Sequence, residues 1–245
     1  MKTSNQYAEE FSRELISHTN PQKAKWLENY VKHGIKSRGV PIPEIRKLLE
    51  KFIKEHSINS KPLKVQLEFI NTLMENTYTD EKLAAILFIQ LYWNETDPGI
   101  QLKTISSWFD KKWVFDWNVC DWLCVKVLNR LIDKYADIAT IEMRKWNKSD
   151  YLWKARASLV SFVYSESLKK EEKLIYEFST NLIKRDERFA KTSVGWILRE
   201  YSKIDEKFVT AFLNKNIKHF TIETVNNSLK YFSKDFRKTY LTKVK

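Results

Sequence analysis

Apolar residues recur at positions i, i+3, i+4 and i+7 almost from one end of this chain to the other. This spacing places them on one face of an α-helix, and no convincing alternating segment is bounded by the turn residues of a hairpin. The chain has only four glycines and five prolines among 245 residues, which leaves little material for tight turns or glycine-rich phosphate loops. The pattern predicts an all-α protein and argues against dinucleotide-binding and P-loop folds.

Start and stop signals divide this pattern into short helices. Asn20 and Pro21 are typical of a helix start, because proline at the first helical position loses no hydrogen bond, and Gly34 is typical of the end of a helix that runs toward His33. Residues 39–43 are expected to form a loop. The other predicted helices are 5–18, 43–57, 62–75, 80–93, 99–108, 117–135, 139–146, 150–165, 168–184, 187–203, 205–213, 221–231 and 233–243.

The helices are expected to form one array of pairs, a single domain over residues 1–245, because no long polar linker interrupts them. Five landmark residues, one from each of five helices, mark a repeat: Arg46, Ala84, Asp121, Arg156 and Trp196. Their separations of 38, 37, 35 and 40 residues are close to the ~40 residues of HEAT-type helix pairs. An irregular helical bundle is the alternative.

The 43 Lys and Arg residues outnumber the 31 Asp and Glu residues and give a net charge of +12. Residues 203–245 contribute strongly, with ten basic and four acidic side chains. Such a surface suits a polyanion such as nucleic acid, although lysine-rich helix faces also occur for solubility alone. Charge by itself does not decide between these two interpretations.

Neither a membrane segment nor a metal site is predicted. No stretch approaches the ~18 apolar residues of a membrane span, and the N-terminal MKTSNQYAEEF has no apolar signal core, so a cytoplasmic location is expected. Cys120 and Cys124 lie four residues apart without the further ligands that zinc needs, and the four histidines form no ligand pattern. We therefore expect reduced core thiols and no metal.

The segment WVFDWNVCDWLCVKVL holds an acid in an unusual place. On an ideal helical wheel, four apolar residues fall within about 40° of Asp121: Trp117, Val125, Leu128 and Ile132. A carboxylate among apolar side chains costs several kcal/mol unless it is hydrogen-bonded, is paired, or lines a cleft in which its charge is used. The structural alternative is that Asp121 accepts bonds from backbone N–H groups in the first turn of its helix.

Two later segments add candidates. Arg156 stands in a helix rich in small and apolar residues and needs an anionic partner, either Asp121 one repeat earlier or a nucleic-acid phosphate. Gly195 lies inside a helical pattern, where glycine costs about 1 kcal/mol against alanine, so it implies close approach of another backbone or of a ligand. Trp196 beside it belongs either to the core or to a ligand site.

Several of these stretches resemble the AlkD family of alkylpurine DNA glycosylases, and together they span nearly the whole chain. Two are N-terminal: HTNPQKA followed by Tyr30, and GVPIPEIR ending at Arg46. The more specific ones are W-x-x-x-D at Trp117 and Asp121, W-x-x-R at Trp153 and Arg156, and GWILREY from Gly195. The resemblance implies a superhelical α-solenoid of HEAT-like antiparallel helix pairs with a concave DNA-binding face.

The resemblance also implies the chemistry. Asp121 would take the position of the catalytic acid, with Trp117 and Trp196 as the tryptophans of the cleft. Six further side chains are the expected DNA contacts: Arg156, Arg199, Tyr30, Arg46, Lys191 and Lys203. The implied reaction is hydrolysis of the N-glycosidic bond of an N3- or N7-alkylated purine in duplex DNA, by a monomer without cofactor, metal or lyase activity.

One departure and two alternatives accompany this hypothesis. Asp116 and Asn118 flank Trp117 where a second tryptophan and an aspartate often stand in the family. A repeat protein that binds damaged or branched DNA without excising a base would need the same positive charge, whereas a protein-interaction solenoid would need only the repeats. Salt-sensitive DNA binding without base release would indicate the DNA-binding repeat protein. DNA affinity that does not fall as the salt concentration rises would indicate the protein-interaction solenoid. The preferred adduct stays open.

Overall fold

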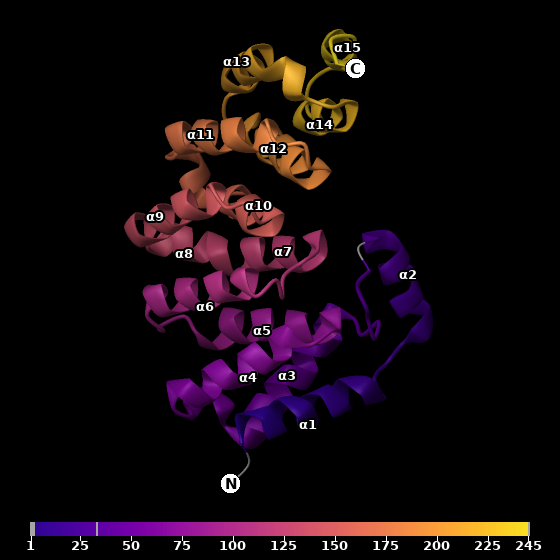
Figure 1. The fold of residues 1–245 in the computed structure, drawn as a ribbon, viewed down its shortest axis with the longest axis vertical. Helices are drawn as coiled ribbons and strands as arrows, with labels where there is room; N and C mark the ends of the chain where they lie inside the picture. Colours follow the sequence, from indigo (N-terminus) through magenta and orange to yellow (C-terminus); the bar gives the residue numbers. More distant parts are fainter. Residues whose placement is uncertain (1–2, 33, 245) are drawn as a thin grey trace. The chain divides into compact units, whose positions relative to one another are not determined.

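The computed structural model describes residues 3–32 and 34–244, and in this part of the chain the regular elements are helices joined by turns (Figure 1). Extended pairing there is limited to one parallel bridge between Lys36 and Tyr78. The chain is therefore all-α, as the apolar spacing predicts. The helices form two compact units, residues 1–127 and 128–245. The single-domain organisation stays a prediction.

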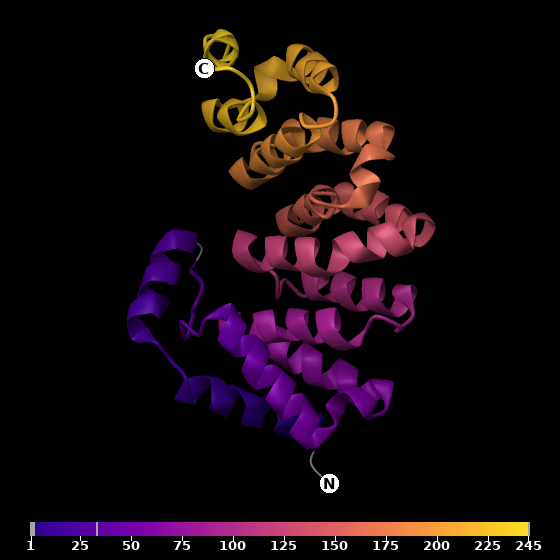
Figure 2. The ribbon, with the colours of Figure 1, turned by 180° about the vertical axis from the view of Figure 1, so that it is seen from behind.

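The first unit consists of two rows of helices, with α1 and α2 beside them (Figures 1 and 2). In the first row α5 packs against both α3 and α7, and in the second row α4 packs against α6; α4 also packs against α5 and α1. The helices are α1 (Ser4–Ser17), α2 (Pro21–Val31), α3 (Ile42–His56), α4 (Leu63–Glu75), α5 (Thr79–Tyr92), α6 (Pro98–Asp110) and α7 (Trp117–Leu123).

The second unit repeats this arrangement. One row places α12 against α10 and α14, and the other places α11 against α9 and α13; α9 with α10 and α11 with α12 form the pairs. The helices are α8 (Asn129–Lys134), α9 (Ala136–Asn147), α10 (Leu152–Val160), α11 (Glu172–Ile183), α12 (Arg188–Tyr201), α13 (Glu206–Asn216), α14 (Ile222–Ser228) and α15 (Lys234–Leu241).

The landmark residues fall on these rows as the repeat predicts. Arg46, Ala84 and Asp121 lie on α3, α5 and α7, which are the first row of the first unit. Arg156 and Trp196 lie on the adjacent helices α10 and α12 of the second unit. Within each unit, a separation of 37 to 40 residues therefore returns the chain to the same row.

The loop between α2 and α3 depends on one glycine. Gly39 has φ +72°, and a Cβ atom there would lie 2.3 Å from the carbonyl oxygen of Asn20 and 2.5 Å from the nitrogen of Ala24. Only glycine fits both the left-handed conformation and this approach of two backbones. Helix α2 begins at Pro21 with Asn20 as its cap, as expected, but it ends at Val31.

The end of α2 differs from the sequence prediction. Lys32, not Gly34, takes the left-handed position that closes the helix, with φ +58°. Gly34 follows with φ +66°, and His33 lies outside the described residues. The helix expected over 150–165 is also shorter than predicted, because α10 ends at Val160 and the chain turns through Tyr164, which has φ +63°.

The helix expected over 117–135 changes its hydrogen bonding along its length. It is α-helical over Trp117–Leu123, π-helical over Cys124–Leu128, and α-helical again in α8. A π turn contains more residues than an α turn, so side chains beyond it are rotated relative to an ideal wheel.

The π turn changes the surroundings predicted for Asp121. Leu128 and Ile132 are completely buried, whereas Trp117, Asp121 and Val125 are only half-buried. Asp121 therefore lies at the edge of the buried stripe and not in its middle. The buried face of α7 consists of Val119, Cys120 and Leu123.

Several sequence expectations concern single residues or short segments. Cys120 and Cys124 are both buried thiols. Gly195 approaches α14, where a Cβ would lie 3.1 Å from Asn227 Cβ and 3.2 Å from the carbonyl oxygen of Thr224, so its neighbour is another helix. Among the described residues, no helix combines the length and apolar character needed to cross a bilayer.

Candidate functional site

Helix α7 begins at a buried acid. Asp116 Oδ1 accepts a hydrogen bond from the Val119 amide at 3.0 Å, which satisfies one of the N–H groups that a helix start leaves unpaired. The residue is 1% exposed, and its Oδ2 is buried without a hydrogen-bond partner among the described residues. Burial raises the pKa of Asp116 to about 6, against the opposing effects of its amide bonds and of Lys82.

Lys82 fixes the segment that precedes α7. Its Nζ donates to the carbonyl oxygens of Met74 at 2.6 Å and Trp113 at 2.8 Å. The residue is 2% exposed, and burial lowers the pKa of Lys82 to about 8. A buried ammonium bonded to both carbonyls holds the chain before Asp116 against the helices α4 and α5.

Trp117 and Asp121 lie one turn apart on α7, so they share a face of the helix. Both are half-buried, which keeps the carboxylate out of the sealed core. The indole Nε1 of Trp117 donates to the carbonyl oxygen of Val31 at 3.3 Å, at the end of α2. The Trp117 ring is thereby held between two helices of the same unit.

Tyr30 extends this aromatic contact onto α2. Its ring meets the Trp117 ring edge-on, with centroids 5.3 Å apart and planes at 76°, and it stacks on Trp26 at 5.2 Å. Trp26 is the functional candidate that the sequence reasoning missed. The available signal was the i, i+4 spacing of two aromatic residues between lysines.

The remaining predicted residue of the first unit is Arg46, which has polar contacts on α3 and α5. Arg46 on α3 donates to Gln90 Oε1 of α5 at 3.2 Å, and its guanidinium lies 4.0 Å from Glu50. Its side chain is 35% exposed, so it keeps access to an external anion.

In the second unit Trp196 forms the centre of a second aromatic and basic cluster. Trp196 is half-buried, with its ring edge-on to that of exposed Tyr164 at a centroid separation of 6.1 Å. The Arg199 guanidinium lies 5.7 Å from the Trp196 ring centroid, within the range of a cation–π contact. Trp196 Nε1 is buried without a hydrogen-bond partner among the described residues.

Glu200 ties the basic residues of this cluster together. It accepts hydrogen bonds from Arg199 Nε at 2.8 Å and from Lys203 Nζ at 2.5 Å. Burial pushes the pKa of Glu200 upward, but the bonds from Lys203 and Arg199 outweigh it, and the net pKa is lowered. The trio keeps one net positive charge beside Trp196.

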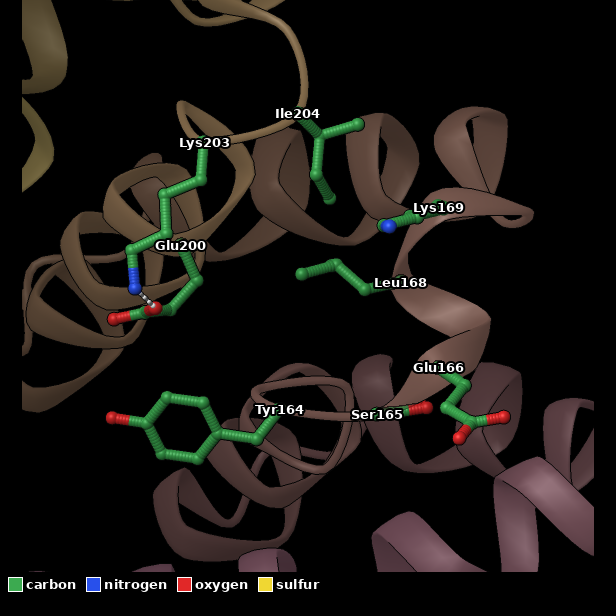
Figure 3. A pocket seen from close by; sticks show the side chains of 8 residues that line it. All are labelled: Tyr164, Ser165, Glu166, Leu168, Lys169, Glu200, Lys203 and Ile204. Carbon is green, nitrogen blue, oxygen red and sulfur yellow. Dashed lines mark hydrogen bonds and ion pairs between the residues drawn. The ribbon is translucent and has the colours of Figure 1, made fainter.

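An open pocket of about 630 Å³ borders this cluster (Figure 3). Tyr164 and the Glu200–Lys203 pair lie at one end of the pocket, and Leu168 and Ile204 form an apolar part of its lining (Figure 3). The lining residues are Tyr164, Ser165, Glu166, Leu168, Lys169, Glu200, Lys203 and Ile204.

Two other predicted DNA contacts are engaged inside the second unit. Arg156 is only 4% exposed, and its Nη1 donates to the carbonyl oxygen of Phe189 at 2.7 Å and to Thr192 Oγ1 at 3.2 Å. Lys191 Nζ donates to the carbonyl oxygen of His219 at 2.7 Å. These bonds fix the start of α12, and a role of either residue in DNA binding stays a prediction.

The structure thus places six of the nine predicted site residues in two groups, each within one unit. Tyr30, Trp117 and Asp121 gather around α7, whereas Trp196, Arg199 and Lys203 gather on α12. Within the described ranges, no group of three or more His, Cys, Asp or Glu residues is arranged to hold a metal ion.

Comparison with known proteins identifies the family of this chain. Residues 11–232 match the family described as DNA alkylation repair enzyme. A solved structure described as a predicted DNA alkylation repair enzyme from Enterococcus faecalis has a TM-score of 0.76 at 19% sequence identity, over 89% of this chain and 98% of that chain. No curated protein matches the sequence. At 19% identity the structural likeness shows a shared fold, and the family match over most of the chain shows that this protein belongs to the DNA alkylation repair enzyme family.

Proposed function

We propose that the protein is a monofunctional DNA glycosylase that hydrolyses the N-glycosidic bond of N3- or N7-alkylated purines in duplex DNA and leaves an abasic site. The observation that carries this proposal is Asp121, a half-buried carboxylate one helical turn from Trp117. A carboxylate in this position remains accessible to a substrate, while its surroundings are partly shielded from solvent.

The chemistry of the proposed substrate requires only one carboxylate. Alkylation at N3 or N7 gives the purine a formal positive charge, so it leaves without a strong general acid. As the bond to the sugar breaks, positive charge develops on the deoxyribose, and a fixed carboxylate can stabilise it and orient the attacking water. The face of Trp117 adds cation–π attraction of about 0.5–2 kcal/mol to the same cationic sugar.

The second unit contributes DNA-binding and aromatic groups in this proposal. Trp196 offers an aromatic face of its own to the DNA, and Arg199 on the same helix and Lys203 just after it contact phosphates. Arg156 lies on α10 and supports α12 indirectly, because its buried guanidinium donates a hydrogen bond to the carbonyl oxygen of Phe189 at the start of α12. No step requires a lysine Schiff base, so base removal occurs without strand cleavage.

A base-release assay tests the proposal. The full chain is incubated with a duplex that contains one N7-methylguanine, and hot alkali then converts each abasic site into a strand break. Asp121→Asn is expected to reduce the single-turnover rate by roughly 10²–10³-fold, the loss typical of removing one electrostatic group at a reacting centre. Asp137→Asn, which changes an exposed carboxylate on α9, is the matched control and is expected to keep the wild-type rate.

The same assay identifies the alternative. Absence of breaks with the wild-type protein, or equal rates for wild type and Asp121→Asn, contradicts the glycosylase proposal. The net charge of +12 favours DNA binding without excision as the second candidate. Tight binding that weakens with salt, together with no base release, would establish that function instead.

A further inference from the structure

Helix α2 carries two large aromatic side chains that face solvent. Trp26 is 60% exposed and Tyr30 is 57% exposed, yet their rings are stacked with centroids 5.2 Å apart and planes 7° from parallel. Along α2, all of which is described, the buried residues are Ala24 and Val31, so this aromatic pair does not serve the core. Exposed stacked aromatics of this kind indicate a binding surface.

The pair is held in a fixed position beside α7. The carbonyl oxygen of Val31 accepts the bond from Trp117 Nε1, and the Tyr30 ring packs edge-on against Trp117. The other end of α2 is fixed as well, because Asn20 N donates to the carbonyl oxygen of Arg38 at 2.8 Å. Since both ends of the helix are anchored, the aromatic faces are presented without a cost of ordering them on binding.

The charge around the pair is positive. Four exposed lysines lie on α2 or within five residues of its end: Lys23, Lys25, Lys32 and Lys36. Glu28, the acid on this helix, accepts a hydrogen bond from the Ser37 amide at 2.9 Å. Aromatic faces surrounded by lysines match a nucleic-acid chain, whose bases stack and whose phosphates carry the opposite charge.

We propose that Trp26 and Tyr30 form a stacking platform for an unpaired nucleobase of the bound DNA, next to Trp117. The inference rests on DNA being the substrate of the proposed function and goes beyond it by assigning Trp26 a role. Inside an intact duplex both faces of a base are covered by its neighbours. The platform therefore binds a base only where stacking is interrupted, and it adds affinity for such sites.

Equilibrium binding of the full chain to two undamaged duplexes tests the platform. The duplexes share their sequence, but one contains a single unpaired 2-aminopurine. The wild-type protein is expected to bind the duplex with the unpaired base more tightly and to quench its fluorescence. Trp26→Ala is expected to lose this preference, with affinity for that duplex roughly 5- to 150-fold weaker, the range for one base stacked on an aromatic ring, and near-wild-type affinity for the paired duplex.

Three further variants test whether the preference depends on an aromatic face or only on apolar area. Trp26→Phe keeps a flat ring and is expected to retain most of the preference, whereas Trp26→Leu keeps apolar area without a π face and is expected to lose it. Ile16→Ala removes a 50% exposed apolar side chain from α1 of the same unit and is expected to change nothing. Because Trp26 faces solvent, unfolding temperatures close to that of the wild type are expected for all its variants.

Several outcomes would overturn the inference. These are an unchanged preference in Trp26→Ala, an equal loss on both duplexes, a Trp26→Leu protein that binds like the wild type, or self-association of the wild type that Trp26→Ala abolishes. Since binding is measured on undamaged DNA, these results do not depend on catalysis. Wild-type base release by Asp121→Asn would refute the proposed activity and leave the platform untouched.

Discussion

Asp116→Asn is expected to make the protein less sensitive to pH, because it removes a buried carboxyl group without removing the helix cap. The amide oxygen of asparagine can still accept the bond from Val119 that Asp116 Oδ1 accepts at 3.0 Å. What disappears is the charge that forms on a residue 1% exposed. The substitution is close to isosteric, so packing around Trp117 is retained.

The magnitude follows from the pKa of Asp116 in the two states. Burial raises the pKa from its usual 3.8 to about 6 in the folded protein. Between these values the folded state binds more protons than the unfolded state, so the contribution of Asp116 to stability is complete below pH 3.8 and is lost as pH rises through about 6. A shift of about two pKa units corresponds to about 3 kcal/mol in the free energy of unfolding.

This effect is measured by denaturant unfolding of the wild type and of Asp116→Asn at a series of pH values. A range from about pH 3.5 to about pH 7.5 brackets the pKa of Asp116 in the unfolded and folded states. The free energy of unfolding of Asp116→Asn minus that of the wild type is expected to rise by about 3 kcal/mol across the range. Glu81, whose pKa burial also raises, titrates in both proteins and cancels in the difference. A difference that stays flat or falls with pH would refute the reasoning, since it would mean that the carboxyl is solvated or ion-paired when charged.

Three further substitutions have expected outcomes. Gly39→Ala is expected to destabilise the protein by about 3–5 kcal/mol, from a strained backbone and from overlap with the α2 backbone, whereas Gly34→Ala, with open space around it, is expected to cost only about 1 kcal/mol. Thermal unfolding compares the two, and equal losses would contradict the close approach. Lys203→Ala is expected to weaken DNA binding and to lower the slope of log affinity against log salt by about 0.9, and an unchanged slope would exclude a phosphate contact.

The fold was largely predictable because its signals are local. The i, i+3, i+4 spacing follows from each helix burying one face, and Asn20 with Pro21 starts α2 as predicted because a cap needs only neighbouring residues. The repeat was predictable for the same reason. A pair of short helices uses a nearly constant length of chain, so Arg46, Ala84 and Asp121 recur on one row.

The π turn after α7 was not predictable from the apolar pattern. Apolar residues continue through Cys124–Leu128 at spacings that an α-helix also satisfies, and only the hydrogen bonds differ. An ideal wheel therefore places Asp121 between Leu128 and Ile132, although Leu128 ends the π turn, Ile132 lies beyond it, and both are completely buried. Tyr164 is a similar case, since nothing in a tyrosine indicates a φ of +63°.

Asp116 at the cap of α7 and Asp121 within the helix are in contrasting environments. The contrast bears on the proposed function, in which a protein of net charge +12 uses a carboxylate against DNA. A phosphate chain attracts the lysines but repels a carboxylate, so binding cannot pull Asp121 toward the sugar. The proposed function therefore requires that the helix hold Asp121 in position before DNA binds. Asp116, buried at the start of α7, does this by capping the helix, and the bond from Trp117 to Val31 fixes the adjacent turn. In the proposed function, the burial that keeps Asp116 from contact with substrate is what allows it to hold the helix that carries the half-buried Asp121.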